Sequence, residues 1–155
     1  MKIPSSAFLV LMLCSAAAVA QTTSAAKPAS MRMAPVPFKG VDYSGVYDCR
    51  GMDSHEGPYN GVVTLELVPS QSHGEYGAYR FKLEVSGYGE YPGQAAAKGR
   101  EMGIFFANTD PAPKDYGTGI ASFAKGKDGK WTFTKYYYEP EFKGGNFGTE
   151  TCFQR

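Results

Sequence analysis

The stretch Ala78-Tyr-Arg-Phe-Lys-Leu-Glu-Val85 alternates apolar and charged side chains almost without a break. Successive side chains of an extended strand point to opposite faces, so the apolar members share one face and the charged members share the other. One buried face and one solvated face are typical of a strand in an antiparallel sheet. This stretch therefore predicts a β-strand, and its period of two is the pattern to look for in the rest of the chain.

The same period recurs along the chain after residue 40. In Asn60–Val68, for example, Val63, Leu65 and Leu67 occupy alternate positions and are expected to face inward. Asp128-Gly129 separates two further stretches, and this dipeptide favours a hairpin turn because both residues tolerate positive φ. The predicted strands are Gly45–Gly51, Asn60–Val68, Ala78–Val85, Gln94–Lys98, Glu101–Asn108, Gly117–Ala124, Trp131–Tyr138 and Phe147–Phe153.

Short strands joined by short turns predict an all-β domain, and the 19 glycines and 10 prolines disfavour a helical bundle. We predict a small antiparallel up-and-down β-barrel of about eight strands, because closure removes the unpaired edges of the sheet. The architecture is similar to that of lipocalin and avidin barrels. The resemblance stops there, since neither a Gly-x-Trp start nor a biotin-type polar set is visible. A β-sandwich is the alternative.

Two cysteines, Cys49 and Cys152, lie in the first and last predicted strands. An even pair in an exported chain usually forms a disulfide, because the compartments outside the cytoplasm are oxidising. The first and last strands of a closed up-and-down barrel are neighbours. We therefore predict a Cys49–Cys152 disulfide.

The N-terminal segment has the pattern of a secretory signal peptide. Lys2 is followed by the apolar run Ala7–Leu13 and by Ala18-Val19-Ala20, a small-x-small cleavage site. We predict cleavage after Ala20 and a periplasmic or secreted location. Lipidation of Cys14 is disfavoured because Leu13 stands where a small residue is needed. Residues 21–40, rich in Ala, Ser, Thr and Pro, are predicted to be a disordered tether, and residues 41–155 form the single domain.

The charge balance argues against partners that are bound by bulk electrostatics. The chain has 16 basic and 15 acidic residues, and removal of residues 1–20 would take away one lysine. A protein without net positive charge has no strong field to hold nucleic acid, so no nucleic-acid partner is expected. No integral membrane segment and no cofactor are expected either.

Groups that carry chemistry are sparse. Asp53-Ser-His55-Glu56 is the densest set of metal-ligand types, but it has no second histidine at ligand spacing, and we interpret it as a polar loop. Glu139-Pro140-Glu141 is the tightest carboxylate pair, and its proline predicts a loop that faces outward. No nucleophile elbow is present. No catalytic residue and no metal site are predicted.

Aromatic side chains give the leading functional hypothesis. Tyr79, Phe81, Trp131 and Tyr137 are expected to point into the barrel, where they would face a ligand if the interior is hollow. We expect an exported, non-enzymatic binding or interaction module whose partner is an unknown small ligand or a protein. The alternatives are a small periplasmic hydrolase that uses loop residues around His55, and a structural envelope protein.

Overall fold

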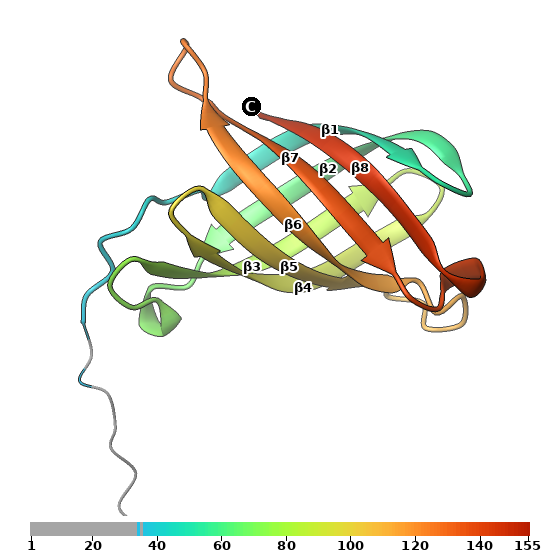
Figure 1. The fold of residues 1–155 in the computed structure, drawn as a ribbon, viewed down its shortest axis with the longest axis horizontal. Helices are drawn as coiled ribbons and strands as arrows, with labels where there is room; N and C mark the ends of the chain where they lie inside the picture. The colour runs from blue at the N-terminus through green and yellow to red at the C-terminus, as the bar shows by residue number, and fades with distance from the viewer. Residues whose placement is uncertain (1–33, 35) are drawn as a thin grey trace, which may run out of the picture. The chain divides into compact units, whose positions relative to one another are not determined.

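The computed structural model describes Ala34 and residues 36–155, which fold into eight strands (Figure 1). The predicted signal peptide, its cleavage site after Ala20, Cys14 and most of the predicted tether lie outside the described residues. Two 3-10 helices, η1 (Pro69–Gln71) and η2 (Phe142–Gly144), lie in the connections. The strands are β1 (Gly45–Asp53), β2 (Gly57–Leu67), β3 (Tyr76–Val85), β4 (Gly89–Lys98), β5 (Glu101–Ala107), β6 (Tyr116–Lys125), β7 (Trp131–Glu139) and β8 (Asn146–Gln154).

The strands form a closed antiparallel barrel in chain order, and β1 pairs with β8 to close it. The predicted up-and-down barrel is therefore confirmed, and the sandwich alternative is wrong. In such a topology successive connections alternate between the two ends of the barrel. Each end thus collects segments that are far apart in the sequence.

The largest error in the strand boundaries concerns β4, which begins at Gly89 rather than at the predicted Gln94. The added part contains Pro92, and proline has no N–H to donate to a neighbouring strand. The part of β4 before Gly93 pairs only with β3, whereas pairing with β5 begins at Gly93. Pro92 therefore lies where β4 is paired with β3 alone, so it interrupts no hydrogen bonds to β5.

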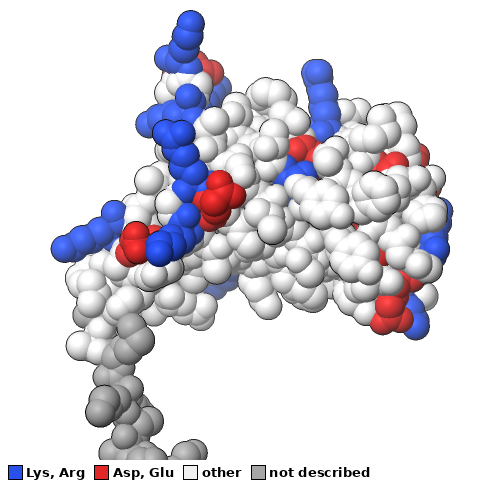
Figure 2. All heavy atoms as spheres, viewed as in Figure 1, with Lys and Arg blue, Asp and Glu red and all other residues white. Residues whose placement is uncertain are grey.

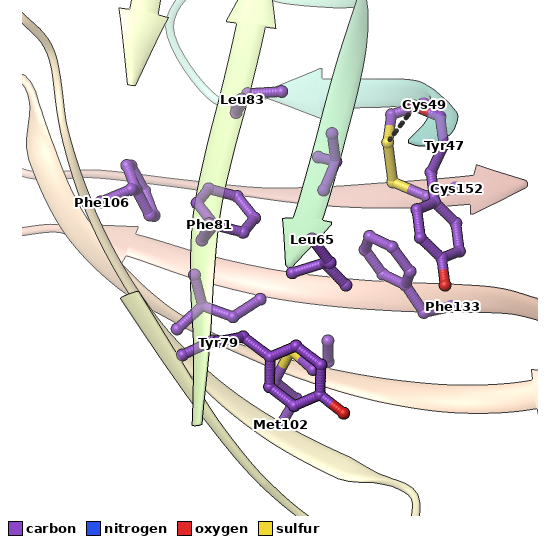
Figure 3. Close-up of a cluster of buried hydrophobic side chains, with 14 of the residues drawn as sticks. Tyr47, Cys49, Leu65, Tyr79, Phe81, Leu83, Met102, Phe106, Phe133 and Cys152 are labelled. Atoms are coloured by element: carbon purple, nitrogen blue, oxygen red, sulfur yellow. Dashed lines mark hydrogen bonds between the residues drawn. A yellow bond between two sulfur atoms is a disulfide. The ribbon is translucent and has the colours of Figure 1, made fainter. Parts of the chain in front are cut away.

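Alternate side chains of every strand fill the middle of the barrel. Val63, Phe81 and Phe133 are at most 2% exposed, and the rings of Phe123 and Phe133 lie 4.9 Å apart, measured between centroids. Figure 3 shows Leu65, Phe81 and Phe133 among the side chains of this cluster. The middle of the barrel is a packed core and not a channel.

Tyr43 covers one end of the barrel, where the β2–β3, β4–β5 and β6–β7 connections lie; we call this the closed end. The Tyr43 side chain is 1% exposed, and its hydroxyl donates to the carbonyl oxygen of Gly99 at 2.7 Å. Its ring lies 4.1 Å from that of Phe123 and 4.9 Å from that of Trp131. The Tyr79 hydroxyl donates to the carbonyl of Val41 and accepts from the Tyr43 amide. These contacts plug the closed end.

The Cys49–Cys152 disulfide lies inside the barrel, at positions that face each other across β1 and β8. The predicted bridge is confirmed. It closes a separation of 103 residues and joins the two strands that complete the barrel. A disulfide is compatible with an oxidising, exported location. In the described part of the chain, no helix has the length and apolar character needed to cross a membrane.

Candidate functional site

The opposite end of the barrel carries the β1–β2, β3–β4, β5–β6 and β7–β8 connections and contains a pocket; we call it the open end. The pocket has a volume of about 50 Å³, which is room for roughly three or four water molecules. Its lining combines acidic, aromatic and aliphatic side chains. The residues used below are Asp53, Glu56, Tyr59, Tyr91, Phe106, Asp115, Lys135, Tyr137, Glu139 and Phe142.

Three carboxyl groups converge on this pocket from three different segments. Asp53 is the last residue of β1, Asp115 immediately precedes β6, and Glu139 is the last residue of β7. Their exposed fractions are 9%, 7% and 5%. The barrel brings them together because β6, β7, β8 and β1 are consecutive neighbours around the wall.

Asn146, the first residue of β8, bridges two of these carboxyl groups. Its side-chain amide is 1% exposed, and the amide nitrogen Nδ2 donates to Asp53 Oδ2 at 2.7 Å and also to Glu139 Oε2. The Ser54 hydroxyl donates to the amide oxygen of Asn146, which is the orientation that directs Nδ2 toward the carboxylates. Asn146 thus holds Asp53 and Glu139 at one point of the pocket wall.

Asp53 is held in its ionised form by hydrogen bonds. Burial alone would raise its pKa, but donation from the Asn146 side chain, the Glu56 amide, the Tyr137 hydroxyl and the His55 amide outweighs burial, and the pKa is lowered. The Tyr137 hydroxyl lies 2.8 Å from Asp53 Oδ2. The two backbone amides bond Oδ1 at 2.8 and 2.9 Å. Asp53 is therefore a fixed negative charge.

Glu139 behaves in the opposite way. Burial raises the pKa of its carboxyl group to about 8, and the negative charges of Asp115 and Asp53 add to the effect, against a smaller lowering by the Asn146 hydrogen bond. Near neutral pH this carboxyl group therefore keeps its proton. Asp115 is bonded through Oδ2 to the hydroxyl of Tyr91 at 2.7 Å. Asp53 and Glu139 thus differ in protonation because hydrogen bonds outweigh burial at Asp53, whereas burial outweighs the hydrogen bond at Glu139.

No ion pair of the described residues involves any of these three carboxyl groups. The lysines at the pocket are already paired: Lys143 binds Glu56 at the rim, and Lys135, which lines the pocket itself, binds Glu150 at 2.7 Å. The donors that reach the three carboxyl groups are neutral hydroxyls and amides. The pocket wall therefore carries negative charge without a matching cation.

Aromatic rings form the rest of the wall. The Phe106 ring lies 6.3 Å from that of Tyr91 and 6.0 Å from that of Tyr137, both edge-on. Burial raises the pKa of the Tyr91 and Tyr137 hydroxyls, so both remain neutral donors. Lys135 Nζ lies over the Phe106 and Tyr137 rings, 5.1 and 5.2 Å from their centroids, so these rings already stabilise one cation.

The four aromatic residues that the sequence predicted to face a ligand do not form one site. Tyr137 lies on the pocket wall. Phe81 lies in the packed middle of the barrel, where its ring centroid is 5.3 Å from Lys135 Nζ. Tyr79 and Trp131 hold the plug at the closed end.

The interpretations of two acidic segments were each wrong at one residue. Glu139 faces inward as the end of β7, and only Glu141, beyond the proline, lies outside, where it bonds Lys114. Asp53, taken as part of a polar loop, is buried. The alternation of inward and outward side chains could have predicted two of these inward positions. Glu139 lies two positions beyond Tyr137 in β7, and Asn146 lies six positions before Cys152 in β8, so each shares the inward face of its strand.

His55 lies at the rim, and its Nε2 is 3.1 Å from the carbonyl oxygen of Gly145. The neighbouring Ser54 hydroxyl bonds Asn146 instead. Among the described residues, the group of Cys, His and acidic atoms close enough to share a metal ion is Cys49, Glu150 and Cys152. Its two sulfur atoms are bonded to each other, so they are not available as ligands.

Comparison with known proteins gives no relative from which to transfer a function: no family model and no curated protein matches the chain.

Proposed function

We propose that this protein is a non-enzymatic binding module that takes a small organic cation, with an amine as its charged group, into the open end of the barrel. The observation that carries the proposal is the set of three buried carboxyl groups, Asp53, Asp115 and Glu139, none of which forms an ion pair with a described residue, since Lys135 in the same pocket is bound to Glu150. A protonated amine fits the charge and offers several N–H donors to carboxylate oxygens.

The protonation of Glu139 supports the same ligand class. The Glu139 carboxyl group, whose pKa is raised to about 8, holds a proton mainly because it is buried, and repulsion from the negative charges of Asp115 and Asp53 adds to the effect. A cation near Asp53 and Asp115 would remove that repulsion and favour the ionised form of Glu139. Ligand binding would then release a proton, which makes binding stronger as the pH rises.

The size of the pocket limits the buried part of the ligand. A volume of about 50 Å³ accommodates an ammonium or methylammonium group and little more. A longer ligand would extend through the open end past Phe142, which lines the pocket mouth. Tyr91, Phe106 and Tyr137 would contact the cation through their rings, an interaction worth about 0.5–1 kcal/mol at an exposed site and about 2 kcal/mol or more where water is excluded.

Isothermal titration calorimetry with methylammonium chloride tests the proposal, with sodium acetate as the anion of similar size. We expect methylammonium to bind and acetate not to bind. Asp53→Asn should weaken methylammonium binding by at least about tenfold, because it removes one charge and about 1.4 kcal/mol or more of attraction. Asp48→Asn is the matched control, since Asp48 is exposed on the outer face and bonds Arg155.

The proposal fails if neither methylammonium nor a longer primary amine binds to the folded protein. It also fails if acetate binds as well as methylammonium does, or if Asp48→Asn weakens binding as much as Asp53→Asn. Circular dichroism of both variants should first establish that they keep the wild-type fold.

We propose in addition that the protein acts in the periplasm or outside the cell. The Cys49–Cys152 disulfide and the predicted cleavage site after Ala20 support this location. The intact mass of the protein recovered from the exported fraction should correspond to residues 21–155 with one disulfide. A full-length mass, or a lipid increment on Cys14, would contradict it.

A further inference from the structure

Two adjacent rows of outward-facing residues cross the outer wall of the barrel between β5 and β1. The strand register places Ile120 beside Tyr136, which is followed across β8 by Thr149 and then by Met52. The next row is Phe105, Thr118, Tyr138 and Phe147. We call these two rows, together with Gly103 beside Ile120, the apolar patch. None of its members carries a charge.

The large side chains of the apolar patch are widely exposed. Ile120 is 63% exposed, Phe147 56%, Met52 55% and Tyr136 52%. Figure 2 shows the central part of this face, over β6, β7 and β8, mostly free of charged atoms. Isolated exposed apolar residues are common on proteins, but a contiguous patch rimmed by polar residues marks an interaction surface.

The other outer face of the barrel has the composition of an ordinary solvated surface. The outward positions of β2 and β3 carry ion pairs, such as Glu66 with Arg80 at 2.9 Å, and Lys82 pairs with Glu84. The asymmetry between the two outer faces does not arise from the fold, because both are walls of the same barrel. It indicates that the apolar patch has a partner.

We infer that a second copy of this chain covers the apolar patch in a two-fold symmetric dimer. A two-fold interface pairs a surface with itself, and an uncharged patch pairs with itself without bringing like charges together. The patch also contains a projection and a hollow side by side. Ile120 stands out from β6, while Gly103, its register partner on β5, leaves open space where a side chain would be.

The area of the apolar patch is close to what a dimer requires. Six large side chains, each about half exposed, offer roughly 100 Å² apiece, or about 600 Å² in all, and the intervening threonines add to this. Stable interfaces bury about 800 Å² per partner. The patch is therefore large enough to form the centre of such an interface.

Sedimentation equilibrium of the exported protein between about 5 and 200 µM tests the inference, because association depends on protomer concentration. We expect a monomer–dimer equilibrium in the wild type. Ile120→Lys should raise the dimer dissociation constant by at least about tenfold, since a lysine would be buried without a partner. Val62→Lys is the matched control, because Val62 lies on the outer face of β2 between Asp48 and Glu84, which tolerate a lysine.

A wild-type protein that stays monomeric at about 200 µM overturns the inference. So does a dimer that Ile120→Lys and Val62→Lys weaken equally. A monomer that sediments with neutral phosphatidylcholine vesicles, and no longer does so after Ile120→Lys, would assign the patch to a lipid surface instead. The apolar patch contains none of the charged pocket residues, so methylammonium binding is expected to remain intact in Ile120→Lys.

Discussion

Lys135 Nζ lies 2.7 Å from Glu150 Oε2 in the interior of the barrel, and the two side chains are 1% and 0% exposed. The rings of Phe81, Phe106 and Tyr137 surround the lysine at 5.1 to 5.3 Å from Nζ. The contact is an ion pair with poor hydrogen-bond alignment, since neither atom has a well-aligned partner within the described chain. The carboxylate also accepts a hydrogen bond from the Tyr59 hydroxyl at 2.6 Å, whereas Glu150 is the one described acidic residue that pairs with the lysine.

Removal of one partner should destabilise the protein more than removal of both. We expect Lys135→Met and Glu150→Leu each to lower the free energy of unfolding by about 3–5 kcal/mol, because each leaves the other charged group buried without its partner. The double variant, Lys135→Met with Glu150→Leu, should lose less than either single variant. Guanidinium unfolding monitored by tyrosine fluorescence measures all three. Additive losses would show that the two charges do not depend on each other.

The disulfide should contribute strongly to stability, because it joins the two strands that close the barrel. A separation of 103 residues corresponds to a stabilisation of up to about 4.7 kcal/mol in the chain-entropy account. We expect the Cys49→Ala and Cys152→Ala double variant to lose about 2–5 kcal/mol of unfolding free energy. Thiol titration of the native wild type should find neither Cys49 nor Cys152 free. A double variant as stable as the wild type would contradict the expectation.

The packed middle of the barrel and the pocket should respond differently to truncation. Phe81→Ala should cost about 3–5 kcal/mol of stability, because Phe81 is 2% exposed in a filled core. Tyr137→Phe removes only a hydroxyl that bonds Asp53. It should weaken methylammonium binding several-fold at a smaller cost in stability, since Asp53 keeps its other donors. A binding loss in Phe81→Ala without a stability loss would place the ligand deeper in the barrel.

Alternation along the strands predicted the fold because it depends only on neighbouring residues. The same rule also predicts part of the site. Lys135 and Glu139 lie two positions on either side of Tyr137, and Glu150 lies two positions before Cys152, so all three are expected to face inward. The sequence analysis did not predict that Lys135, Glu139 and Glu150 face inward, because isolated charges are rarely buried.

The sequence could not predict that Asp53 and Asp115 line the same pocket. It depends on the closure of β1 against β8 and on the path of the loop before β6, which no local pattern specifies. The position of Trp131 was missed for a related reason: the period of two tells which face a side chain occupies but not which end of the barrel is plugged.

The stability of the protein should depend on pH through Glu139. Its pKa is raised from 4.5 to about 8 in the folded protein. The folded state therefore binds a proton that the unfolded state releases, and the resulting stabilisation is fully present below pH 4.5 and is lost as the pH rises through 8. We expect the wild type to lose a few kcal/mol of unfolding free energy between about pH 5 and 9. Glu139→Gln should remove most of this slope, because glutamine does not titrate.

The same group should set the pH dependence of ligand binding. Because the cation favours ionised Glu139, methylammonium should bind the wild type about tenfold more weakly at pH 7 than at pH 9, while the amine itself stays mostly charged. Glu139→Gln should flatten this dependence. Glu141→Gln is the matched control, since Glu141 lies two residues further on, outside the barrel, and bonds Lys114. Equal pH profiles for the two variants would mean that another group holds the proton, and the account of Glu139 would have to be abandoned even if the amine still bound.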